Sequence, residues 1–138
     1  MTTKREPTSS GLVTSTQHDL IKHEIFSIVS GDELTPEGVA TLASRARLRF
    51  NENMVWSIGA VGLKRVLRET RAPLASLFNE FRIRGGILIV VIGAADGYVA
   101  SALQICAFNA GNVPLKIVKN ASAASELIKK FRAEQTKS

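Results

Sequence analysis

An uninterrupted apolar run, ILIVVI at Ile87–Ile92, constrains the fold more than any other segment of the chain. Every residue in this run carries a branched aliphatic side chain, and the pair Gly85-Gly86 precedes it. Such runs, when turn residues bound them, are typical of strands that are buried on both faces. The sequence therefore predicts a central strand here, within a sheet that other elements cover on each side.

Helical and strand patterns alternate around this run. Thr35-Pro36-Glu37 predicts a helix start, with Thr35 as the N-cap and Pro36 at the first helical position. Residues 54–61 fit a buried strand better than a helix, although the pattern alone allows both. We expect a half-buried strand or hairpin over 21–30, strands over 54–61, 87–92 and 115–118, and helices over 36–50, 73–84, 98–110 and 122–132. This order predicts an α/β fold, with a mostly parallel central sheet of about 4–5 strands flanked by about 4 helices.

The first 17 residues are rich in Ser, Thr and charge and carry little apolar surface. We expect a flexible N-terminal tail over residues 1–17 and a single α/β domain over residues 18–138. The N-terminus lacks the apolar segment of a secretory signal, and residues 87–92 are too few to span a bilayer. These features predict a cytoplasmic protein without a membrane span. The single cysteine, Cys106, is expected to be a core thiol, and it excludes an internal disulfide.

The chain carries 18 basic and 12 acidic residues, which gives a formal net charge of +6 and favours an acidic partner. Its densest basic segment holds Lys64, Arg65, Arg68 and Arg71, with Glu69 among them. This segment is a candidate contact for an acidic protein face or for phosphates. No aromatic residue lies between these cations, so the pattern does not support a platform for stacking nucleic-acid bases.

Gly93, Asp96 and Gly97 form the best small-ligand candidate, because they join the predicted central strand to the following helix. Ligands of open α/β sheets bind beyond the carboxyl ends of the strands, where helix N-termini attract anions. The loop lacks the Lys-Ser or Lys-Thr of a phosphate-binding loop, and Asp96 also fits an ordinary helix cap. An enzyme using this loop is therefore a minor alternative. No acid–base pair, catalytic triad, metal-ligand spacing or cofactor motif is recognisable, so we expect a protein that is not an enzyme and has no cofactor.

Three short motifs resemble those of a known family. Ser30–Leu34 (SGDEL) resembles an "SGEL" strand-end turn, Arg84–Leu88 (RGGIL) resembles a "GG-x-L" strand entry, and Ala123–Leu127 (AASEL) resembles an "EEAL" helix start. Over about residues 20–132 the chain is similar to the STAS family, the sulphate-transporter and anti-sigma-factor-antagonist domains. The resemblance implies a regulatory protein that binds a kinase, an anti-sigma factor or another regulator, often switched by phosphorylation at a "DSSG" segment.

At the place of that segment this chain has Arg68-Glu69-Thr70-Arg71. An acid next to a hydroxyl is retained, but the flanking arginines depart from the family pattern and no serine is present. We hypothesise that Thr70 is phosphorylated and that the neighbouring Lys and Arg side chains hold the added charge. The alternative is an unmodified threonine facing solvent in a basic loop.

The main alternative function is a small basic RNA-binding protein of the ribosomal L7Ae/L30e type. Ile58–Arg65 faintly resembles the "G-x-N-E" helix start of that class, with Val61-Gly62 in place of the Asn-Glu pair. The basic charge favours nucleic acid as a partner, whereas the motif detail opposes it. The sequence also leaves a homo-oligomer open.

Overall fold

The computed structural model describes residues 12–19, 23–93 and 97–137 of the chain. The strands are β1 (Leu12–Asp19), β2 (Glu24–Ser30), β3 (Glu33–Leu34), β4 (Val55–Gly59), β5 (Arg65–Val66), β6 (Leu88–Ile92) and β7 (Leu115–Val118). The helices are α1 (Pro36–Ala46), α2 (Arg71–Ile83), α3 (Gly97–Asn109) and α4 (Ala121–Lys137), with short 3-10 helices η1 (Arg47–Arg49) and η2 (Arg68–Thr70). None of the helices in these ranges is long and apolar enough to cross a membrane.

A five-stranded sheet with the order β1-β2-β4-β6-β7 forms the centre of the molecule. β1 is antiparallel to β2, and the other neighbouring strands are parallel. The predicted α/β fold with a mostly parallel sheet is therefore confirmed. β3 and β5 form a separate two-stranded parallel sheet that the sequence did not predict.

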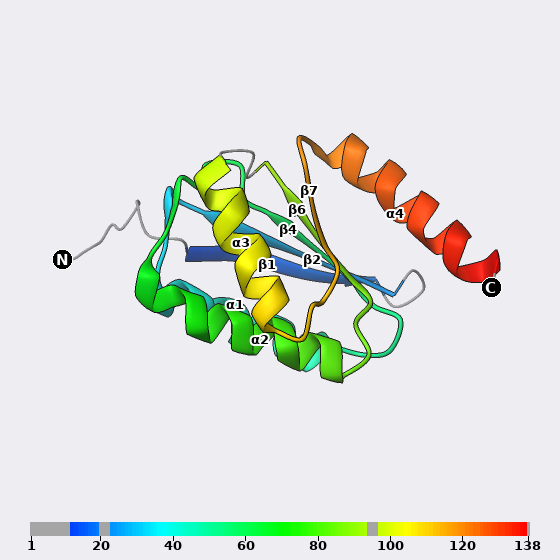
Figure 1. Ribbon diagram of the computed structural model, residues 1–138, viewed down its shortest axis with the longest axis horizontal. Helices are drawn as coiled ribbons and strands as arrows, with labels where there is room; N and C mark the ends of the chain where they lie inside the picture. Colours follow the sequence, from blue (N-terminus) through cyan, green and yellow to red (C-terminus); the bar gives the residue numbers. More distant parts are fainter. Residues whose placement is uncertain (1–11, 20–22, 94–96, 138) are drawn as a thin grey trace.

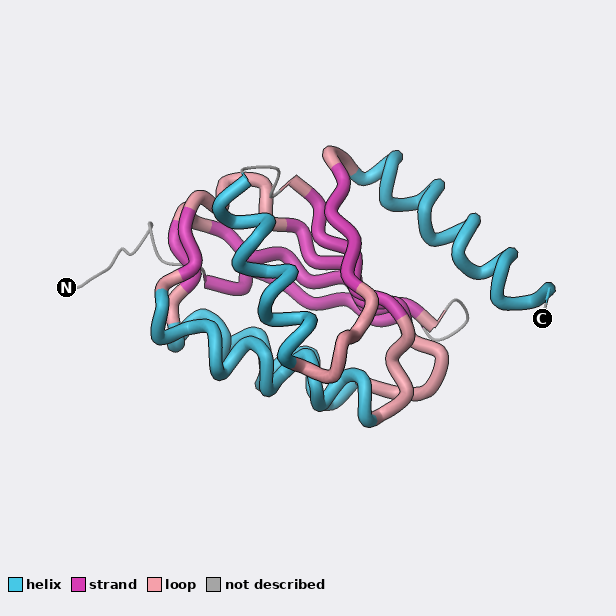
Figure 2. Tube along the Cα trace, in the orientation of Figure 1, coloured by secondary structure: helices cyan, strands magenta, loops and turns pink. Residues whose placement is uncertain are grey.

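Each crossover from β2 to β4, β6 and β7 moves one position in the same direction across the sheet. Because parallel crossovers are right-handed, steps in one direction place their helices on one face. Figures 1 and 2 show α1, α2 and α3 together on one side of the sheet and α4 on the other.

The larger core lies between the sheet and α1, α2 and α3. Its aromatic centre joins Trp56 of β4 to Phe50, Phe78 and Phe81, with ring centroids 5.2–6.1 Å apart. Trp56 is fully buried, and its indole N–H donates to the Ser27 hydroxyl at 3.0 Å. This bond satisfies both buried polar groups and fixes β2 against β4.

The glycine pair before β6 has a steric cause. Gly85 adopts φ +104°, which favours glycine. A Cβ on Gly86 would lie 2.3 Å from the Phe81 ring. The pair therefore lets the chain turn tightly and enter β6 directly beneath the aromatic cluster.

The smaller core lies between α4 and the opposite face of the sheet. Ala124 and Ile128 of α4 pack there on Val55, Leu88 and Val90. All five residues of β6 are buried, alternating between the two cores. The predicted burial of this strand on both faces is confirmed.

Two sequence predictions about the ends are wrong. Residues 12–17 are not a flexible tail, because they belong to β1 and pair with β2. The last helix does not end near Arg132 but continues to Lys137. Both segments are mostly polar in sequence, so no apolar pattern marked them, and they are continued by main-chain hydrogen bonds of the sheet and of the helix.

Candidate protein-binding surface

The basic segment lies on a loop that the main chain anchors firmly. β5 pairs with β3, and the Lys64 and Arg65 amides donate to the Asp32 carbonyl at 2.7 and 2.9 Å. These bonds turn the loop outward at the carboxyl ends of β2 and β4. The conformation is therefore set by backbone contacts, which leaves the side chains available for recognition.

The structure places Lys64, Arg65, Arg68 and Glu69 at the surface. Arg65 lies 3.5 Å from the Glu33 carboxylate, a distance typical of a loose surface ion pair. Exposed pairs of this kind contribute little free energy and hold the side chains weakly. The loop therefore presents a positive surface that can reorganise around an acidic partner.

Thr70, in contrast, is not part of the exposed surface of this loop. Its side chain is fully buried, and its hydroxyl donates to the Leu34 carbonyl at 2.9 Å. The expectation that Thr70 faces solvent is wrong, because this hydrogen bond draws η2 onto β3. A kinase could reach the hydroxyl only if η2 separated from β3. The folded structure therefore opposes the phosphorylation hypothesis.

Arg71 connects the basic loop to α3. It is half-buried, and its Nε atom is buried without a hydrogen-bond partner among the described residues. The Cys106 thiol lies 3.7 Å from the Arg71 carbonyl. Burial raises the pKa of Cys106 above its ordinary value, and the positive charge of Arg71 opposes that shift. Cys106 is therefore the predicted core thiol, and it is held in its neutral form.

Helix α3 is apolar on both sides. One side buries Val99, Leu103 and Cys106 against α2 and the sheet. The other side exposes Tyr98, Ile105 and Phe108, with exposed fractions of 54%, 48% and 69%. Surface helices ordinarily carry polar residues on the solvent side, so the large apolar residues there make this side of α3 a candidate contact surface.

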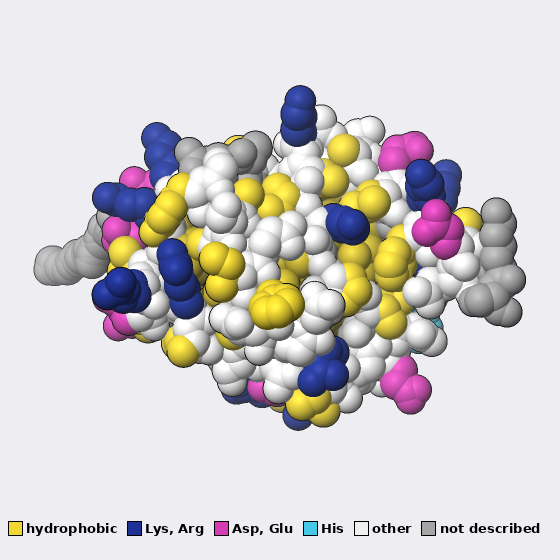
Figure 3. Space-filling view, viewed as in Figure 1, with side chains coloured by type: hydrophobic (Ala, Val, Ile, Leu, Met, Phe, Trp, Pro, Cys, Tyr) yellow, Lys and Arg dark blue, Asp and Glu magenta, His cyan; other side chains and the backbone are white. Residues whose placement is uncertain are grey.

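The apolar side of α3 begins next to the basic loop, because α3 packs against both α2 and β5. In Figure 3, Lys and Arg side chains lie with some Asp and Glu at the end of the molecule where α2 begins, and several separate hydrophobic side chains lie over α3. We call this combination the α3 surface. It consists of Tyr98, Ile105, Phe108, Lys64, Arg65 and Arg68.

The predicted small-ligand loop is only partly described. Gly93 adopts φ +93°, and a Cβ there would lie 2.8 Å from the Val61 Cα atom. Gly93 is thus explained by close packing of two loops. Gly97 begins α3, with no atom within 4 Å of its Cβ position. Asp96 lies outside the described residues, so a ligand role for this loop stays a prediction.

Within residues 12–19, 23–93 and 97–137, no group of three or more His, Cys, Asp or Glu side chains is arranged to hold a metal ion.

The exposed apolar side of α3 was not predicted from the sequence. Its signal was the absence of charged residues from 98–110, a segment that was predicted only as a helix containing a core thiol.

No family model matches this chain, and comparisons with curated proteins and with solved structures also find no match. The chemistry and geometry of the α3 surface are therefore the basis for inferring what the protein binds.

Proposed function

We propose that this protein is a non-catalytic regulatory or scaffold subunit that binds another protein through the α3 surface. This proposal rests on the exposed apolar side of α3, which lies next to the loop that carries Lys64, Arg65 and Arg68. Large aromatic and aliphatic side chains at the centre of a charged rim are the usual composition of a binding hot spot. The STAS resemblance supports the same class of function.

The proposed partner carries an apolar patch bordered by Asp or Glu side chains. The apolar patch would cover Tyr98, Ile105 and Phe108. Because these side chains are already partly buried, covering each contributes less than the roughly 1.5–3 kcal/mol of a fully exposed one. The acidic border would face Lys64, Arg65 and Arg68. Such charges speed association and select the partner more than they add affinity. Thr70 phosphorylation forms no part of this proposal, since the hydroxyl is buried.

The test begins with a photo-crosslinking amino acid at Ile105 in the full chain. Irradiation in a lysate of the native cells, followed by mass spectrometry, identifies the protein that contacts α3. That protein is then purified and titrated calorimetrically against the wild type, Phe108→Ser and Leu48→Ser. Leu48 is the matched control, because it is 83% exposed but lies in η1, outside the α3 surface.

We expect Phe108→Ser to weaken binding by about tenfold or more, as for a central interface residue. Leu48→Ser should bind like the wild type, and higher salt should weaken both in parallel. Equal affinity of the two variants would contradict the proposal. Loss of the crosslinked protein after nuclease treatment would favour the RNA-binding alternative instead.

A further inference from the structure

Helix α4 is attached to the sheet more lightly than the three helices on the other face. Among its described side chains only Ala124 and Ile128 are buried, whereas α1, α2 and α3 each bury four or five residues. A cavity of about 430 Å³ also separates part of α4 from β2 and β4. Because elements with few buried apolar contacts open before the rest of a fold, α4 is a candidate for local opening.

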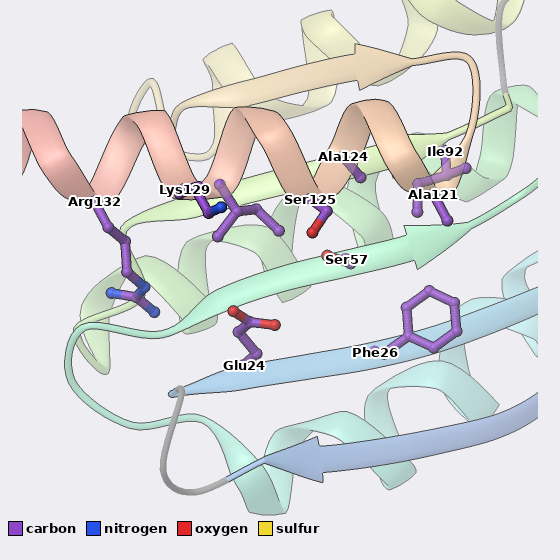
Figure 4. Close-up of a pocket in the computed structure, with 10 residues that line it drawn as sticks. Glu24, Phe26, Ser57, Ile92, Ala121, Ala124, Ser125, Lys129 and Arg132 are labelled. Carbon is purple, nitrogen blue, oxygen red and sulfur yellow. The ribbon is translucent and has the colours of Figure 1, made fainter.

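Arg132 reaches across this cavity from the later turns of α4. It donates to the His23 and Asn53 carbonyls, at 3.0 Å in each case. His23 directly precedes β2, and Asn53 lies shortly before β4. Figure 4 shows the Arg132 side chain extending from α4 toward the starts of these two strands. The later part of α4 is therefore tied to the sheet by a cation that bridges two main-chain carbonyls.

Both residues that accept these hydrogen bonds adopt a left-handed backbone conformation. The φ angle is +55° at His23 and +59° at Asn53, a region that residues other than glycine rarely occupy. Such residues persist where the surrounding structure holds them, and they concentrate at clamps and switch regions. Two left-handed residues that offer their carbonyls to one guanidinium indicate a specific clamp, which we call the Arg132 latch.

The surface beneath α4 is apolar and well shielded. The strand residues packed against α4 are at most 7% exposed, and they are Val55, Leu88, Val90 and Ile92. α4 contributes no strand to the sheet, so its departure would leave all five strands paired. Movement of α4 would therefore uncover an apolar face without changing the architecture of the sheet.

The link before α4 is short and lets the helix move as a unit. Only Lys119 and Asn120 separate β7 from α4. The Asn120 side chain accepts a hydrogen bond from the Ala123 amide at 2.8 Å, so the first turn of α4 is capped from within this segment. The helix therefore keeps its start when its contacts with the sheet are lost.

We propose that α4 is a hinged cover that the Arg132 latch holds closed, and that the chain exchanges between a closed and an open state. In the open state α4 turns about Lys119-Asn120, and the apolar face beneath it is exposed. A molecule that binds only this exposed face shifts the population toward the open state. The cover lies across the sheet from the α3 surface, so this inference goes beyond the proposed function and does not depend on it.

The first test uses one thiol in each core of the full-length protein. Val90→Cys places a thiol beneath α4, and the native Cys106 lies in the core on the other face. Under native conditions a thiol reagent should modify the introduced thiol about tenfold faster than Cys106 or more, because opening of α4 exposes only the first. Modification of both thiols at one rate would show that exposure requires global unfolding, and it would overturn the proposal.

The latch itself is tested by Arg132→Gln, with Lys130→Gln as the control at an exposed position of the same helix. Hydrogen exchange followed by NMR measures each element separately. Loss of the charged donor should speed exchange in α4 by about tenfold or more and leave α3 unchanged. Lys130→Gln should exchange like the wild type. Unaltered exchange of α4 in Arg132→Gln, or equal acceleration of α3 and α4, would contradict the latch.

The left-handed acceptor gives an independent variant. Asn53→Gly keeps the conformation accessible, whereas Asn53→Ala disfavours it and so turns the carbonyl away from Arg132. Exchange in α4 should be faster in the alanine variant than in the glycine variant. Asn112→Ala is the matched control, because it also replaces a left-handed asparagine but lies after α3. Equal acceleration of α4 by Asn112→Ala and Asn53→Ala would assign the effect to general destabilisation and count against the latch.

Discussion

Thr70 holds the segment after β5 against β3 through one buried hydrogen bond to the Leu34 carbonyl. Replacing Thr70 by Val keeps the shape but removes the donor, and we expect a loss of about 1 kcal/mol in the free energy of unfolding. Thr70→Glu places a carboxylate in a buried position and should destabilise the fold much more. Urea denaturation measures both effects, with Glu69→Gln as the exposed neighbouring control.

A Thr70→Glu variant as stable as the wild type would mean that this segment opens readily. The hydroxyl would then be accessible to a kinase, and the phosphorylation hypothesis would recover its support.

Cys106 provides a second prediction about a single residue. Burial raises its pKa above the ordinary value of 9.0, so the folded chain keeps the thiol protonated at pH values where the unfolded chain loses the proton. The resulting stabilisation is fully present below pH 9 and is lost as the pH rises toward the folded-state pKa. We expect Cys106→Ala to show a smaller decline in the free energy of unfolding above pH 9 than the wild type.

The same burial predicts slow chemistry at this sulfur. A thiol-specific reagent at pH 8 should modify Cys106 far more slowly in the native protein than in urea. Equal rates in the two conditions would show that the contact between α2 and α3 is open.

At the level of elements, α1 begins at a capping residue. The Thr35 hydroxyl accepts a hydrogen bond from the Gly38 amide at 3.0 Å. Thr35→Ala should therefore lower the free energy of unfolding by about 1 kcal/mol. Ser44→Ala, in the exposed last part of the same helix, is the control and should be neutral or slightly stabilising, because alanine favours helices. Thermal denaturation of both variants distinguishes the cap from general helix propensity.

Elements with strong local signals were predictable. Thr35-Pro36 marked the start of α1, the branched run marked β6, and residues 115–118 coincide with β7. β1 was missed because its polar sequence LVTSTQHD has no apolar periodicity, and its pairing with β2 becomes apparent only in the sheet. Local pattern cannot reveal an edge strand that is held by main-chain hydrogen bonds.

The candidate site was less predictable than the fold. Exposure of Lys64, Arg65 and Arg68 agrees with their charge. Burial of Thr70 follows from a partner 36 residues away, which no local pattern encodes. Register between β2, β4 and β6 decides which residues lie beside Ser57 and Gly59, so these two appeared in the sequence only as parts of an apolar strand.

At the level of the whole molecule, protection is concentrated at the centre of the sheet. β4 and β6 pair on both edges, and all of their residues are buried. Amides of Val55–Gly59 and Leu88–Ile92 should therefore exchange with deuterium more slowly than those of α4, which contacts the sheet along one side only. Hydrogen exchange followed by NMR tests this order, and equal protection of α4 would contradict it.

The placement of α4 also has a consequence for biosynthesis. α4 follows every strand in the chain, so a ribosome releases the complete sheet before the segment that covers Val55, Leu88 and Val90. During that interval a nascent chain presents a wide apolar face to its surroundings, the kind of surface that chaperones recognise and that promotes misassembly.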